Sequence, residues 1–210
     1  MSRYHLGFEE LDGTPTTGPS GKMVRSTICL ALCEALGGSV TACLPAAISL
    51  ELIHRTSLIF DDIQDHSSAR THRPTVVSAV GVDRAINVGL TLSCYARLAI
   101  HGLLDRGITP RQVLAVHQLL EASVLALCVG QDQDLSMGIS AIAKGQSLGH
   151  PTGHLTGHPT GQFKGPSKGY PTLQDYQEMV RLKTGALLAT GCKTGGIAQR
   201  SPVAFTWSTR

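Results

Sequence analysis

Most of this chain consists of long segments in which apolar residues return every three or four positions, separated by turn residues. The first segment runs from Met23 to Leu36 and stops at Gly37 and Gly38. Such a return places apolar side chains on one face of an α-helix. Alternating runs of Val, Ile, Thr and Tyr with hairpin turns, which would indicate strands, are nearly absent. The sequence therefore predicts an all-α fold with further helices at about 41–65, 82–104, 110–137 and 172–190.

Two stretches lack this helical pattern. Residues 1–20 end in the turn-rich run DGTPTTGPSG, and residues 138–171 repeat a G-H-x-T unit at Gly149, Gly153 and Gly157. Glycine and proline at this density do not support a packed element, so we expect a flexible inserted loop rather than a metal site formed by the repeated histidines. The expected organisation is an irregular lead-in at 1–20, a helical core at 21–137 and 172–196, the inserted loop at 138–171, and an irregular tail at 197–210.

Composition narrows the function classes. A chain of 210 residues is long enough for one domain with a substantial core, and a net charge of +3 with 4% aromatic residues argues against a nucleic-acid partner. The six cysteines lie mostly in apolar, helix-like stretches and are expected to be reduced core thiols. The N-terminus lacks an apolar signal core, and no transmembrane segment is expected. We therefore expect a soluble, cytoplasmic protein.

Three aspartates stand together at the end of the expected helix 41–65. Helical geometry places His54, Asp61 and Asp65 on one stripe, and Asp62 about 100° away from Asp61. Carboxylates at a helix C-terminus are unfavourable by a few tenths of a kcal/mol or more each, so the group requires a cation. Clustered carboxylate oxygens suit Mg²⁺, which also binds water and phosphate oxygens. The alternative is a solvated helix end that leads into a polar loop.

Basic residues flank these acids on both sides in the sequence. Arg70 and Arg73 follow the acids, while Lys22 and Arg25 come just after Gly21. Such a set suits a site that holds phosphate both through Mg²⁺ and by direct charged hydrogen bonds. The alternative for Lys22 and Arg25 is that they are ordinary charges at the start of a helix.

Five motifs resemble those of the trans-type isoprenyl diphosphate synthases, the polyprenyl synthetase family. SLIFDDIQD followed by ARTHRPTV resembles the first aspartate-rich motif, GKMVRS resembles G-K-x-x-R-P, and ELIH resembles E-x-x-H. GQDQDL matches G-Q-x-x-D-L, and YQEMVRLKTGALL matches Y-x-x-M-x-x-x-K-T-G-A-L. The motifs follow the family's order over about 21–135 and 172–196, and CLALCEALGG is similar to geranylgeranyl diphosphate synthases in particular. The resemblance implies an isoprenoid-synthase-type helical bundle.

The resemblance also implies roles for single residues. Catalysis would depend on Asp61, Asp62, Lys183 and Gln131, with Gln131 near the reacting carbons and Asp134 facing the same cavity. The implied ligands are Asp61, Asp62 and Asp65 for Mg²⁺; Arg70, Lys183 and Thr184 for the allylic diphosphate; and Lys22, Arg25 and His54 for isopentenyl diphosphate. Each role has a plain alternative: a core histidine at position 54, a polar helix end at 131 and 134, and surface residues at 183 and 184.

The sequence departs from the family pattern at four places. Met23 replaces a basic residue, Thr71 replaces the second of two adjacent arginines, and Leu90 replaces an acid. Arg73 is the nearest candidate to compensate for Thr71. No Asp or Glu follows Glu178, so the family's second aspartate-rich motif is missing. We therefore expect a bundle truncated at its C-terminus, and a turnover lower by many powers of ten if each lost contact supplied about 3–4 kcal/mol.

Three interpretations follow from these features. The first is a geranylgeranyl-type polyprenyl diphosphate synthase that joins isopentenyl diphosphate to an allylic diphosphate in isoprenoid biosynthesis, impaired by the missing motif. The small Thr56 and Ser57 would leave room for a product of about twenty carbons or more. The second is a non-catalytic homologue or partner subunit, associated as a homodimer or as a heterodimer with a full-length synthase. The third, a terpene cyclase, needs a downstream Asn/Ser/Glu metal triad that this acid-free stretch does not supply.

Overall fold

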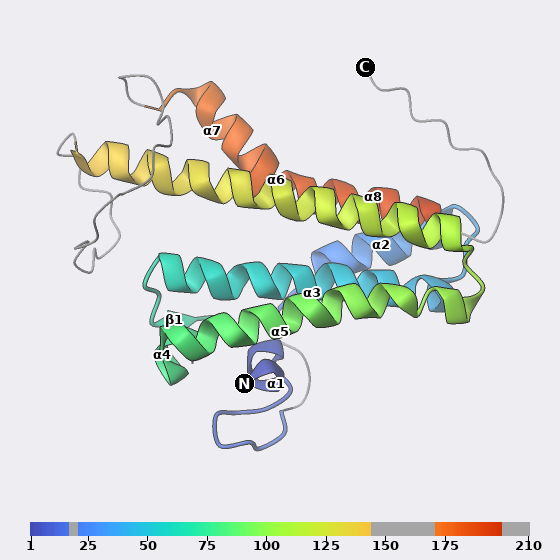
Figure 1. Cartoon of the computed structure of the whole chain (residues 1–210), viewed down its shortest axis with the longest axis horizontal. Coiled ribbons are helices and arrows are strands. Elements are labelled where there is room, and N and C mark those ends of the chain that lie inside the picture. Colours follow the sequence, from blue (N-terminus) through green and yellow to red (C-terminus); the bar gives the residue numbers. More distant parts are fainter. Residues whose placement is uncertain (17–20, 144–170, 199–210) are drawn as a thin grey trace. The chain divides into compact units, whose positions relative to one another are not determined.

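The computed structural model describes residues 1–16, 21–143 and 171–198 (Figure 1). The chain divides into two compact units, Met1–Glu121 with Leu187–Arg210, and Ala122–Ala186. Helices account for nearly every described element, and the only strands among them are two residues long. The expected all-α fold is confirmed.

Three helices form the centre of the first unit. They are α2 (Val24–Ala35), α3 (Val40–Gln64) and α5 (Val82–His101), each within about three residues of the expected bounds. The hydroxyl of Ser39 accepts from the Ala42 amide and caps the start of α3. Helix α3 packs along α5 and also against α2 (Figure 1). The helices pack tightly, and the side chains of Leu50, Ile59, Leu92 and Ile100 between them are almost completely buried.

The N-terminal stretch is more ordered than the sequence suggested. Residues Ser2–Leu6 form a short helix, α1, so the expectation of an irregular lead-in is wrong there. Tyr4 is the reason, because its ring is buried in a cluster with Ile59 of α3 and Leu92 of α5. Its hydroxyl donates to the carbonyl oxygen of Pro74 at 2.7 Å. One aromatic side chain thus anchors a segment that has no apolar periodicity of its own.

A small hairpin follows α3. Strands β1 (Ala69–Arg70) and β2 (Arg73–Pro74) pair antiparallel, and Thr71 and His72 between them have φ values of 51° and 64°. Positive φ at both central residues suits a two-residue hairpin turn, which usually contains Asn and Gly. Thr and His stand at these two positions instead, so the hairpin was not predicted from the sequence. The short helix α4 (Val76–Val80) starts directly afterwards, capped by Thr75.

The long helix α6 runs over Pro110–Ala143, preceded by the short η1 (Leu104–Arg106). It continues beyond the expected end near residue 137, so residues 138–143 are helical and do not belong to a loop. The repeated G-H-x-T units and most of the expected tail lie outside the described residues.

The C-terminal helix is divided into three described parts. Helix α7 (Leu173–Val180) begins at a capping box formed by Thr172 and Asp175. A π-helical turn, η2 (Arg181–Gly185), and α8 (Ala186–Ile197) follow. Gly195 of α8 lies so close to α2 that a Cβ there would overlap the Cys29 carbonyl oxygen. Glycine is therefore required at this helix crossing.

Only some of the cysteines are core residues. Cys29, Cys33 and Cys43 are buried free thiols, and the Sγ atoms of Cys29 and Cys43 lie 3.6 Å apart. Cys94 and Cys128 are exposed, so the expectation of core thiols is wrong for these two.

Two described helices, α3 over Val40–Gln64 and α6 over Pro110–Gly138, are long and apolar enough to cross a membrane by length and composition alone. This is weak evidence, since core helices of soluble proteins pass the same test. The expected cytoplasmic location and the expected lack of a transmembrane segment stay predictions.

Candidate active site

The three aspartates at the end of α3 have different surroundings. The side chain of Asp62 is buried at 2% exposure, while Asp61 is partly exposed at 19%. Asp65 is the C-cap residue of α3 and is exposed. Within the described ranges no three His, Cys, Asp or Glu side chains converge as a metal site. The helical turn therefore does not present the triplet as one cluster, because Asp62 points inward.

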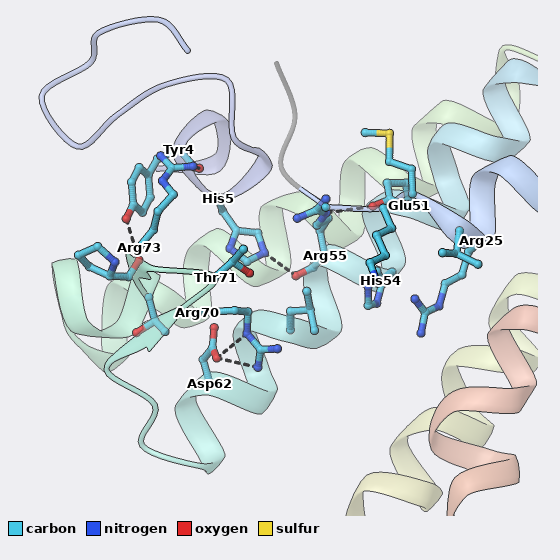
Figure 2. A pocket seen from close by; sticks show the side chains of 17 residues that line it. Tyr4, His5, Arg25, Glu51, His54, Arg55, Asp62, Arg70, Thr71 and Arg73 are labelled. Atoms are coloured by element: carbon cyan, nitrogen blue, oxygen red, sulfur yellow. Dashed lines mark hydrogen bonds and ion pairs between the residues drawn. The ribbon is translucent and has the colours of Figure 1, made fainter. Parts of the chain in front are cut away.

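Arg70 of the β1–β2 hairpin bridges two of these carboxylates. Its Nη2 lies 2.8 Å from Asp61 Oδ2. The same Nη2 lies 2.8 Å from Asp62 Oδ1, and the Nε donates to Asp62 Oδ1 at 2.9 Å (Figure 2). Burial raises the pKa of Asp62 above its ordinary value, and the hydrogen bond from Arg70 opposes that rise. The acidic end of α3 thus holds a cation from the chain itself.

A cavity of about 390 Å³ opens beside this ion pair, within the first unit (Figure 2). Of the expected site residues, Lys22, Arg25, His54, Asp62 and Arg70 line it. These residues come from the segment that leads into α2, from α2 itself, from α3 and from the hairpin, and the fold brings them to one cavity. The lining also contains Arg73, and it contains His5, Glu51 and Arg55, for which the sequence suggested no role in the site.

Positive charge dominates the electrostatics of this cavity. Burial, followed by the nearby guanidinium groups of Arg25, Arg55 and Arg70, lowers the pKa of His54 to about 3. His54 is therefore neutral at physiological pH. Burial also lowers the pKa of Arg25, and its Nε is buried without a hydrogen-bond partner among the described residues. A buried, unsatisfied donor in a positive cavity is suited to an anion.

Glu51 and Arg55 support the wall of the cavity. Arg55 Nε donates to Glu51 Oε1 at 3.0 Å, and Glu51 Oε2 accepts from the Ser26 hydroxyl at 3.4 Å. Gly21 has φ of 101°, and a Cβ there would lie 2.8 Å from Arg55 Nη2. The pair therefore connects α3 to the segment that carries Lys22 and Arg25. An arginine next to His54 in an otherwise apolar stretch was the available signal for this role.

Arg73 does not replace the arginine missing at position 71 in any simple way. Its Nη2 donates to the Glu9 carbonyl at 2.7 Å and to Glu10 Oε2 at 3.1 Å, and its guanidinium lies over the Tyr4 ring at 4.4 Å. These contacts hold the Arg73 guanidinium against the N-terminal segment. The conjecture that Arg73 compensates for Thr71 gains no support from this arrangement.

The remaining expected site residues belong to the second unit. Lys183 Nζ donates to Asp134 Oδ2 at 2.6 Å, and Lys183 and Thr184 lie on the π-helical turn η2. A Cβ on Gly130 would overlap the backbone of Lys183, so α6 and η2 approach closely there. Gln131 follows Gly130 and is half-buried. The glycine of G-Q-x-x-D-L thus allows the contact that brings Lys183 to Asp134.

Comparison with known proteins agrees with these features. The family model described as polyprenyl synthetase matches residues 14–206. A geranylgeranyl diphosphate synthase from Mycobacterium tuberculosis is 32% identical over 199 residues, which are 94% of this chain and 47% of that protein. A short chain isoprenyl diphosphate synthase from Methanocaldococcus jannaschii is 27% identical over 84% of this chain and 44% of its own length. The chain spans about half the length of these curated relatives.

Solved structures give the same result. A polyprenyl synthetase from Streptomyces coelicolor A3(2) has a TM-score of 0.72 and 27% identity over 96% of this chain and 50% of that one. A geranylgeranyl pyrophosphate synthetase from Pyrococcus horikoshii has a TM-score of 0.66 and 30% identity, covering 85% of this chain and 45% of that one. By their names, all four of these proteins are prenyl or polyprenyl synthases or synthetases.

Proposed function

The chain belongs to the polyprenyl synthetase family, and from this premise we propose that it binds an allylic diphosphate and isopentenyl diphosphate and joins them into a longer prenyl diphosphate. The observation that carries the proposal is the positive cavity beside the acidic end of α3, lined by Lys22, Arg25, His54 and Arg70. The resemblance of the sequence to geranylgeranyl diphosphate synthases supports a product of that type.

Lys22, Arg25 and His54 are the proposed ligands of the isopentenyl diphosphate. The two cations neutralise the phosphate oxygens by charged hydrogen bonds. His54, neutral because of its surroundings, serves as a hydrogen-bond donor or acceptor rather than as a third charge. The unsatisfied Nε of Arg25 supplies a donor that the fold itself does not use.

Asp61, Asp62 and Asp65 are the proposed Mg²⁺ residues, and the donor set fits. Carboxylate oxygens are the ligands that Mg²⁺ prefers, and Arg70 already places a positive charge between Asp61 and Asp62. When bound, Mg²⁺ would neutralise the charge that develops on the departing diphosphate. Asp61 and Asp65 lie nearer the surface than Asp62, which is buried.

The resemblance implies further roles for residues of the second unit. Lys183 and Thr184 would hold the allylic diphosphate, and Gln131 would lie beside the reacting carbons, as the resemblance implies. In the reaction the allylic C–O bond breaks, diphosphate leaves, the isopentenyl double bond forms the new C–C bond, and a proton is lost. Asp61, Asp62, Lys183 and Gln131 are the residues on which this step would depend.

We also propose that the chain associates with a second copy or with a longer synthase. Helix α5 exposes Leu90, Tyr95 and Leu98 at 53%, 56% and 59%. Exposed apolar residues grouped on one helix are typical of a surface that another protein covers. Sedimentation of the purified chain, alone and mixed with a full-length synthase, tests this association.

The function is tested by incubating the purified chain with Mg²⁺, labelled isopentenyl diphosphate and an allylic diphosphate. We expect an extended prenyl diphosphate and its loss in Arg25→Gln. Arg84→Gln, which removes the same charge from an exposed position on α5, is the matched control and should keep the wild-type product. Absence of product from the wild-type chain would contradict the proposal.

A further inference from the structure

The Arg70 guanidinium holds oxygen atoms that a metal ion at Asp61 and Asp62 would need. Nη2 contacts Asp61 Oδ2, and both Nη2 and Nε contact Asp62 Oδ1, at 2.8 to 2.9 Å. A divalent cation bound to the same oxygens would meet a like charge at close range. Metal and guanidinium therefore compete for this end of α3.

Arg70 is placed so that it can also reach an anion in the cavity. Its side chain is 36% exposed and lines the same cavity as Lys22, Arg25 and His54. No described residue accepts a hydrogen bond from its Nη1, so two of its five N–H donors are available on the cavity side. A phosphate group is a strong bidentate partner for a guanidinium.

The hairpin that carries Arg70 is itself held in place. Tyr4 donates to the Pro74 carbonyl, and Arg73 lies over the Tyr4 ring. The turn at Thr71 and His72 has positive φ at both residues, a conformation that few non-glycine residues adopt. Because these contacts hold the backbone of the hairpin, a change of partner is confined to the Arg70 side chain.

From this geometry we propose that Arg70 is an exchangeable counter-ion, which occupies Asp61 and Asp62 in the free protein and passes to the diphosphate when metal and diphosphate bind together. This inference rests on the proposed function, and it adds a coupling between the binding of the metal and the binding of the diphosphate. The chain should bind a divalent metal weakly without diphosphate, because the metal must first displace the guanidinium. Each ligand then favours the other, since both act on the same side chain.

The test measures Mn²⁺ binding to the full chain by calorimetry, with no phosphate present. Arg70→Gln should bind Mn²⁺ about tenfold more tightly than the wild type, a typical size for such coupling. The double variant Asp61→Asn with Arg70→Gln should lose that gain, which places the metal at this site. Arg84→Gln removes one positive charge elsewhere on the first unit and should leave Mn²⁺ affinity unchanged. Equal affinities of Arg70→Gln and the wild type would overturn the proposal.

A second titration uses inorganic pyrophosphate without metal. Arg70→Gln should bind it several-fold more weakly than the wild type, because the Nη1 donors are lost. Equal pyrophosphate affinities of Arg70→Gln and the wild type would overturn the proposed transfer of Arg70 to the anion. If Arg70→Gln does not fold, judged by far-UV circular dichroism, Arg70→Lys replaces it, because lysine contacts one carboxylate at a time. Unchanged Mn²⁺ affinity in that variant would also overturn the proposal. Neither titration involves turnover, so failure to form a prenyl product leaves both results interpretable.

Discussion

Arg55 and Glu51 form an ion pair across one turn of α3, with Nε and Oε1 3.0 Å apart and side-chain exposures of only 9% and 12%. The pair connects three parts of the first unit. Glu51 also accepts from Ser26 at the start of α2, and the Arg55 carbonyl oxygen lies 2.8 Å from His5 Nε2 of α1. It therefore supports the cavity wall without being one of the expected ligands.

Replacing Glu51 by Gln should destabilise the fold. The substitution leaves a buried guanidinium without its carboxylate, and breaking a buried pair in this way costs about 3 kcal/mol. Urea denaturation followed by circular dichroism measures the change. Glu178→Gln is the matched control, because Glu178 pairs with Arg181 on an exposed surface and its loss should have little effect. Equal midpoints for both variants would show that burial of the Glu51 pair does not matter.

The helices of this chain were predictable because their pattern is local. Apolar spacing located α2, α3, α5 and the start of α6 within a few residues. The elements that were missed, α1 and the β1–β2 hairpin, depend on distant contacts. Tyr4 orders α1 by packing against residues more than fifty positions away, and its hydroxyl and ring also hold the hairpin. Neither contact leaves a periodic signal in the sequence.

Substituting Gly130 by Ala should disturb the second unit. A Cβ at this position would overlap the Lys183 backbone, which must then move away from α6 and from Asp134. We expect a lower thermal midpoint by circular dichroism. Gly138→Ala on the same helix meets nothing within 4 Å and should be neutral or slightly stabilising, since Ala favours a helix by roughly 0.5–1 kcal/mol over Gly. A Gly130→Ala midpoint as high as that of Gly138→Ala would contradict the close approach.

The cysteines should react in two classes. Cys94 and Cys128 are exposed, whereas Cys29, Cys33 and Cys43 are buried. Burial raises the pKa of Cys33 to about 12, which suppresses the reactive thiolate. A thiol reagent such as DTNB should therefore modify Cys94 and Cys128 rapidly in the native protein and the buried three only after unfolding, with mass spectrometry locating each label. Rapid native labelling of Cys29 or Cys43 would contradict the packing of α2 on α3.

The acidic triplet shows where sequence reasoning about the site reaches its limit. Helical spacing placed Asp61, Asp62 and Asp65 at one helix end, and α3 does end there. The basic residues predicted a positive site, and Lys22, Arg25 and Arg70 line one cavity. Spacing does not determine which carboxylate is buried. That depends on the hairpin, which brings Arg70 over Asp62 and leaves Asp65 exposed.

The pKa of His54 should report the positive charge of the free cavity and the binding of an anion there. Its pKa is lowered to about 3 by burial and by Arg25, Arg55 and Arg70, whereas an unfolded chain has a histidine pKa near 6.5. Below pH 6.5 the unfolded state therefore takes up a proton that the folded state does not, so the free energy of unfolding falls as the pH decreases from 6.5 toward 3. His54→Gln removes this contribution, and its unfolding free energy should decline less steeply over that range. A bound anion offsets the neighbouring cations, so inorganic pyrophosphate should raise the His54 pKa above its value in the free protein. NMR titration of the imidazole measures both values, and a His54 that titrates near 6.5 in the free protein would contradict the positive, buried setting assigned to it.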